Sequence, residues 1–171
     1  MRPLLNNTLK MVDRVTTISA VIGGVLIAVM TAIVTIAVIT RYVLSQPIGW
    51  SEEVSIYMMI WAIFLGTAYT LKENAHIGVD LLMNRLPPHL KPFLLCFHYL
   101  AGLLFISILF LKGIDMINLS VTLGSRSIAT NFPLYIAQLA VPVGAALLIL
   151  QLIAKLLLLI DRWPERNKTE A

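Results

Sequence analysis

Four long stretches without a charged side chain limit most strongly what this chain can fold into. They cover residues 15–40, 54–71, 93–111 and 128–154, and none contains Asp, Glu, Lys or Arg. A helix rises ~1.5 Å per residue, so about 20 residues cross the ~30 Å hydrocarbon core of a bilayer. The sequence therefore predicts an all-α integral membrane protein with four transmembrane helices, forming a single membrane domain over residues 1–171.

The composition supports a membrane protein. Of the 171 residues, 58% are hydrophobic and 13% are charged, whereas about a quarter are charged in an average soluble domain. We attribute the net charge of +4 to basic residues on cytoplasmic loops rather than to a nucleic-acid partner. The single cysteine, Cys96, lies in an apolar run, where it is expected to pack as a small hydrophobic residue.

The first apolar stretch is expected to remain in the mature protein as an anchor. It is longer than the apolar region of a signal peptide, and residues 38–41 offer no small-x-small cleavage site. Ten Lys and Arg residues lie on the side of the two termini, against three on the other side, Arg41, Lys112 and Arg126. The excess of positive charge predicts that both termini are cytoplasmic.

The connection between the first two spans contains a turn at Pro47 and a potential helix cap at Ser51. Glu52 and Glu53 then fall on the electropositive first turn of the second helix, where they stabilise it. A second interpretation pairs one glutamate with Arg41 across the loop, and a third offers one to a partner protein.

A short interfacial helix is predicted over residues 77–86, between the second and third spans. Its apolar residues fall on one face: Val79, Leu82, Met83 and Leu86. His76 and Asp80 are four residues apart and share another face. We expect them to hold this helix against the second span or a partner, since two such side chains are too few for a metal site.

The third helix is expected to continue over residues 112–123, because apolar residues recur there at helical spacing. Asn131 and Pro133 are candidates for the start of the fourth helix, and Pro142 is expected to kink it. Small residues form ridges at 24, 28 and 32 and at Ala62 and Gly66. Such ridges let helices approach closely, either within the chain or against a partner.

The middle of each span lacks acidic and basic residues apart from His98. Carriers that move protons or charge normally place such residues there, which argues against an autonomous small transporter or channel. A haem or quinone anchor is a further alternative, but axial histidines would have to face each other across helices. The sequence carries no phosphate loop, nucleophile triad or metal-binding spacing, so we expect neither an enzyme nor a cofactor of its own.

An ordered set of motifs runs from the end of the first span into the following loop. It comprises Arg41-Tyr42, Pro47, Trp50-Ser51-Glu52-Glu53, Tyr57, Trp61, Phe64-Leu65-Gly66, His76 and Asp80. This set resembles the small (Q-type) membrane subunit of tripartite ATP-independent periplasmic (TRAP) transporters, which typically reads R-Y-x-x-x-x-P-x-x-W-S-E-E, F-L-G-A-A and H-x-x-V-D. Arg126 and Pro142 lie in segments that resemble the family's last helix.

The resemblance covers roughly residues 10 to 160, with one departure. Family members often carry an arginine close before the tyrosine, whereas Ser55 and Ile56 precede Tyr57 here. Any pairing made by that arginine is therefore not carried over.

The resemblance implies a three-part importer in the bacterial inner membrane. A periplasmic binding protein would capture an organic acid, of the sialic acid or dicarboxylate class, and deliver it to a large multi-span subunit. That subunit would hold the substrate and sodium sites. The small subunit would do no chemistry and would pack against the large one as a scaffold in the lipid bilayer.

Overall fold

The computed structural model describes residues 2–73 and 91–166. The helices are α1 (Arg2–Tyr42), α2 (Ser51–Lys72), α4 (Lys91–Thr122), α5 (Leu134–Gln138) and α6 (Ala140–Arg166). Four segments are long and apolar enough to cross a membrane: Leu9–Tyr42, Ser51–Lys72, Leu94–Thr122 and Leu134–Leu159. The prediction of an all-helical fold with four spans is confirmed. The expected interfacial helix at 77–86, with His76 and Asp80, lies outside the described residues.

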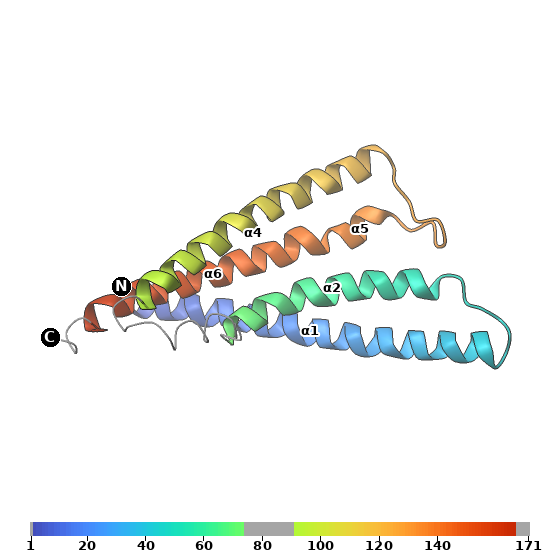
Figure 1. Ribbon diagram of the computed structural model, residues 1–171, viewed down its shortest axis with the longest axis horizontal. Helices are drawn as coiled ribbons and strands as arrows, with labels where there is room; N and C mark the ends of the chain where they lie inside the picture. The colour runs from blue at the N-terminus through green and yellow to red at the C-terminus, as the bar shows by residue number, and fades with distance from the viewer. Residues whose placement is uncertain (1, 74–90, 167–171) are drawn as a thin grey trace.

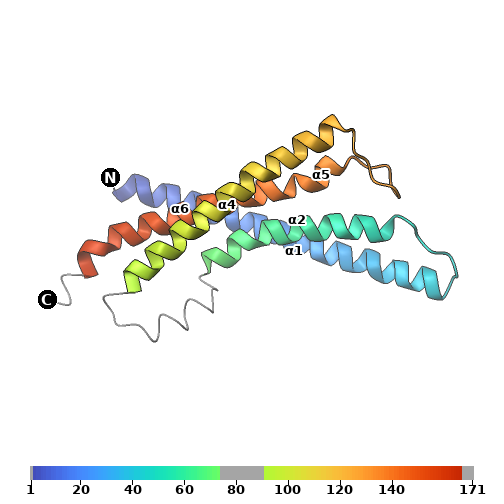
Figure 2. The ribbon, with the colours of Figure 1, turned by 45° about the horizontal axis from the view of Figure 1, so that its top comes forward.

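The long helices lie side by side in the order α1, α2, α6, α4 (Figures 1 and 2). The main contacts join α1 to α2, α2 to α6, and α6 to α4. Both chain termini lie at one end of this layer, which we call the termini end (Figure 1). The helices diverge toward the other end, which carries the two described connections and which we call the loop end.

The core lies where α2 and α6 meet. Ala68 and Leu71 of α2 pack with Leu148 and Leu152 of α6. Nearer the loop end, α6 approaches α2 at Gly144, where an added Cβ atom would lie 2.6 Å from the Cβ atom of Phe64 and 2.8 Å from its carbonyl oxygen. Only glycine fits this contact without a shift, because real Cβ atoms do not approach other atoms so closely.

Ala62 and Gly66, the two residues of the predicted ridge on α2, have different environments. Ala62 is buried, and an added Cβ atom on Gly23 of α1 would lie 3.1 Å from its carbonyl oxygen. Gly66 has open space beside it, as has Gly24 on α1. Ala62 therefore packs within the chain, whereas Gly66 makes no close contact there.

The helix of the fourth span begins after the predicted boundary at 128, and the candidate start at Pro133 is confirmed, since Pro133 is the backbone cap of α5. Residues 128–133 belong to the connection after α4, and helical structure starts at Leu134 rather than at 128. Asn131 has a left-handed backbone (φ 55°), which breaks helical geometry before Pro133. The expected distortion near Pro142 is present as an interruption at Leu139, between α5 and α6. Proline has no N–H group, so Pro142 cannot donate to the carbonyl of Gln138 one turn earlier.

The second span differs from the prediction at its start, whereas the third helix continues as predicted. The backbone cap of α2 is Trp50, and no side chain caps the helix. The predicted Ser51 cap is wrong, because its hydroxyl donates to the carbonyl oxygen of Ile48 over 2.8 Å. The continuation of the third helix is confirmed, since α4 runs to Thr122.

Candidate functional site

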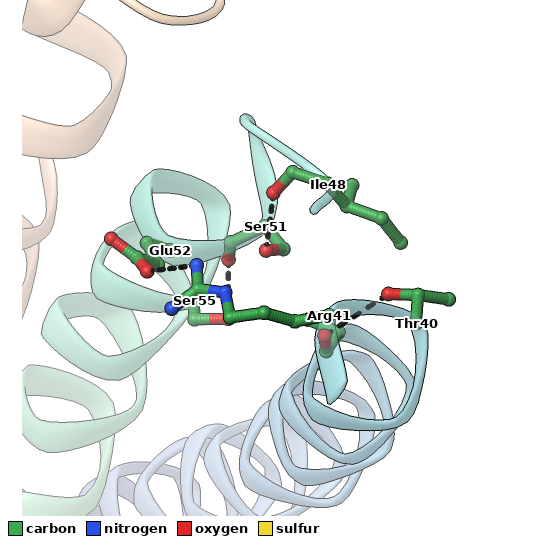
Figure 3. A network of polar contacts seen from close by, with 7 residues as sticks. Thr40, Arg41, Ile48, Ser51, Glu52 and Ser55 are labelled. Atoms are coloured by element: carbon green, nitrogen blue, oxygen red, sulfur yellow. Dashed lines mark hydrogen bonds and ion pairs between the residues drawn. The ribbon is translucent and has the colours of Figure 1, made fainter. Parts of the chain in front are cut away.

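At the loop end, an ion pair joins the last turn of α1 to the first turn of α2. The guanidinium of Arg41 lies 2.6 Å from a carboxylate oxygen of Glu52 (Figure 3). Both side chains are substantially exposed, at 45% and 71%. The predicted pairing across the loop is therefore confirmed for Glu52. An exposed pair of this kind orients the connection but adds little stability.

Glu53, the neighbouring glutamate, faces the connection that follows α4. Its carboxylate accepts hydrogen bonds from the hydroxyl of Tyr57 and, over 3.2 Å, from that of Thr130. The ring of Tyr57 lies 6.0 Å from that of Phe132. Glu53 thus links α2 to residues more than 70 positions later. The four-residue spacing of Glu53 and Tyr57 signals their contact in the sequence, but the contact with Thr130 has no such signal.

The connection itself, residues 123–133, is an ordered turn. The amide of Ser127 donates to the carbonyl oxygen of Phe132 over 2.9 Å, and the hydroxyls of Ser127 and Thr130 lie 2.9 Å apart. The guanidinium of Arg126 donates to the carbonyl oxygen of Asn131 over 3.3 Å. Arg126 is therefore held by its own turn while remaining exposed.

The two candidate tryptophans have different roles. Trp61 points from α2 toward the last span, and its indole N–H donates to the carbonyl oxygen of Ile136 in α5 over 3.2 Å. Trp50, at the start of α2, is 48% exposed. Its position suits the interfacial belt in which tryptophan is enriched.

The termini end contains a buried polar contact between α1 and α6. Gln151 and Thr16 are each only 1% exposed. The amide nitrogen of Gln151 donates to a carboxylate oxygen of Asp13 over 3.3 Å, and its oxygen accepts from the hydroxyl of Thr16 over 3.4 Å. An amide in an apolar helix needs such partners, because unsatisfied polar groups are costly there.

Two lysines extend this contact to α2. The ammonium of Lys72 donates to the hydroxyl of Thr17 over 2.9 Å, and that of Lys155 donates to the carbonyl oxygen of Lys72 over 2.7 Å. The hydroxyl of Ser19 donates to the carbonyl oxygen of Leu65 over 3.1 Å. This network was not predicted from the sequence. The only signal was Gln151, an amide inside an otherwise apolar run.

At the loop end and at the termini end, polar side chains form fixed hydrogen bonds that join the helices. In residues 2–73 and 91–166, no three His, Cys, Asp or Glu side chains gather where they would hold a metal ion. The rings of His98 and Tyr99 are tilted 56° to each other, with centroids 5.7 Å apart. The candidate residues thus fall into a loop-end group, containing Arg41, Glu52, Glu53, Tyr57 and Arg126, and a set placed along the spans, containing Trp61, Gly66 and Pro142.

Comparison with known proteins gives a family match over most of the chain. The model of the DctQ component of tripartite ATP-independent periplasmic transporters matches residues 30–162. The C4-dicarboxylate TRAP transporter small permease protein DctQ of Rhodobacter capsulatus is 29% identical over 99 residues, which are 58% of this chain and 44% of that protein. The chain thus spans less than half the length of that relative.

Two other relatives differ in how much of their length is matched. The sialic acid TRAP transporter small permease protein SiaQ of Vibrio cholerae is 25% identical over 154 residues, covering 86% of this chain and 85% of that protein. The isethionate TRAP transporter permease protein DctMQ of Oleidesulfovibrio alaskensis is 29% identical over 112 residues, covering 63% of this chain but 17% of that much longer protein.

Proposed function

Because this chain belongs to the DctQ component family of tripartite ATP-independent periplasmic transporters, we propose that it is the scaffold subunit of a sodium-coupled importer of organic acids. In this proposal it packs against a large transport subunit and performs no catalysis. The family match over residues 30–162 is the observation that carries the proposal.

The arrangement of the helices supports a scaffold role. The interhelical hydrogen bonds hold α1, α2, α5 and α6 together. None of the residues in the most apolar stretch of α4 is buried, so that helix has surface available for lipid or for another membrane protein. In the DctMQ permease, a segment similar to this chain occupies a small part of a much longer protein. That arrangement supports a large membrane subunit as the partner.

Charge and topology support an orientation in the bacterial inner membrane. The N-terminal part of α1 and the C-terminal part of α6 lie at one end of the helix layer (Figure 1), and the sequence predicts ten of the thirteen Lys and Arg residues on the side of the two termini. The positive-inside rule then places the termini end in the cytoplasm and the loop end in the periplasm. A periplasmic binding protein would approach from the loop end.

The relatives guide the choice of substrate class. Their names include C4-dicarboxylate, sialic acid and isethionate, all of which are organic anions. We infer an organic acid, with sialic acid or a dicarboxylate as the first substrates to test. The sodium and substrate sites belong to the large subunit in this proposal.

Affinity purification from native membranes tests the proposed function. The tagged chain, solubilised gently, should recover one much larger multi-span protein in stable amounts. Liposomes with both subunits and the binding protein should then take up the organic acid only under an inward sodium gradient. Recovery of the chain alone, together with uptake by liposomes that contain only this chain, would establish the competing function of an autonomous transporter.

A further inference from the structure

Polar residues line one face of the second half of α4. Lys112 and Asp115 form an ion pair with 3.0 Å between nitrogen and oxygen, and their side chains are 73% and 66% exposed. Asn118 and Thr122 follow at helical spacing and are also exposed. We call these four residues the α4 polar face. It lies on an edge helix of the layer, since the main contact of α4 is with α6 alone.

The ion pair lies within Leu94–Thr122, the part of α4 that is long and apolar enough to cross a membrane. An added Cβ atom on Gly113 would lie 3.1 Å from Val141 and 3.2 Å from Pro142, so this level of α4 is fixed against α6. Pro142 is eight residues beyond Leu134, where the last span begins, which places it about 12 Å inside that boundary at ~1.5 Å per residue.

Asp115 is one turn closer to the loop end than Lys112. Three residues correspond to about 5 Å along a helix, so its carboxylate also remains inside the boundary set by Leu134. A lysine side chain is long enough to reach toward the headgroups, but an aspartate side chain is not. Charged groups facing hydrocarbon are costly and are normally covered by protein or water.

The exposed face of α1 provides a contrast. Thr31 and Thr35 lie on this face, and each hydroxyl donates over 2.8 Å to a backbone carbonyl of the preceding turn. Their polar atoms are therefore satisfied within the helix. Thr122 on the α4 polar face is satisfied in the same way, by the carbonyl oxygen of Asn118 over 2.8 Å. The two faces therefore differ in the charged Lys112–Asp115 pair and in the exposed Asn118, which the face of α1 lacks.

We propose that the α4 polar face docks against the large transport subunit, whose own polar groups surround the Lys112–Asp115 pair at this depth. The inference rests on the proposed function and adds to it the surface through which the two subunits meet. The depth of the pair favours a membrane protein over a soluble partner. The partner's matching surface should contain hydrogen-bonding side chains rather than leucine or valine alone.

Two paired substitutions of similar size test this surface. Lys112→Leu with Asp115→Leu removes the charges from α4, and Thr31→Leu with Thr35→Leu is the matched control on α1. The tagged full-length chain is co-expressed with the large subunit recovered by the wild type. The α4 variant should recover at least tenfold less of that subunit at an equal amount of chain in the membrane, while the α1 variant should match the wild type.

Labelling provides a second measurement that does not depend on removing charge. In a Cys96→Ser background, Asn118→Cys is treated with a small, membrane-permeant maleimide, with Leu44→Cys in the exposed loop as the control. Asn118→Cys should be labelled in the chain alone and protected at least tenfold in the complex, while Leu44→Cys is labelled in both.

The results separate this inference from the proposed function. Equal recovery of the large subunit by the α4 variant and the wild type would overturn the docking surface while leaving the proposed function intact. Equal labelling of Asn118→Cys in the chain alone and in the complex would also overturn it, because water or lipid headgroups would then cover this face. Failure of the wild-type chain to recover any large subunit would overturn both.

Discussion

Replacing Gly144 by alanine tests whether the contact between α2 and α6 is as close as the structure shows. The added methyl group would lie 2.6 Å from the Cβ atom of Phe64 and 2.8 Å from its carbonyl oxygen. Neither atom can move without moving α2. Overpacking of this kind costs about 1–3 kcal/mol. For a chain of this length that corresponds to a fall in the melting temperature of roughly 3–10 °C.

The assay is thermal unfolding of the purified chain in detergent, followed by circular dichroism. Gly24→Ala is the matched control, because an added Cβ atom there meets nothing within 4 Å. It should leave the melting temperature unchanged or raise it, since alanine favours helix more than glycine does. Phe64→Ala should not rescue Gly144→Ala, because alanine keeps both clashing atoms. Equal melting temperatures for Gly144→Ala and Gly24→Ala would refute the close contact.

Three further predictions concern the polar contacts. Gln151→Leu should lower the free energy of unfolding by about 1–3 kcal/mol, because Asp13 loses a buried partner; equal stability in chemical denaturation would contradict this. Arg41→Ala and Glu52→Ala should show a small coupling in a double-mutant cycle, and this coupling should disappear in 1 M salt because exposed pairs are screened. Glu53→Ala should speed hydrogen exchange in residues 123–133, whereas unchanged exchange would show that this turn holds itself in place.

The spans were predictable because apolar runs report directly on membrane crossing. The ion pair between Arg41 and Glu52 could also be predicted, because a short connection brings both residues to the same end of the helix layer. The position of Pro142 predicted the region in which the last helix is interrupted, because the missing N–H group of proline is a local property of the sequence.

Other features depend on tertiary contacts that no local pattern encodes. Residues 128–133 carry no charge and were predicted to belong to the fourth span, yet Asn131 adopts a left-handed backbone there and the turn is fixed to Glu53. The contact of Gln151 with Asp13 joins residues 138 positions apart. The sequence shows which residues of a span are polar, but it does not show which neighbouring helix each of them faces.

The side-by-side order of the helices has a consequence for how the chain assembles after insertion. Eight residues connect α1 to α2, and eleven connect α4 to α5, so each pair of neighbouring spans can close as an antiparallel helical hairpin over a short loop. The two hairpins then meet mainly between α2 and α6, with smaller contacts between α1 and α6 and between α2 and α5. We expect the two hairpins to form first and then to dock, so that the close contact at Gly144 forms when they meet.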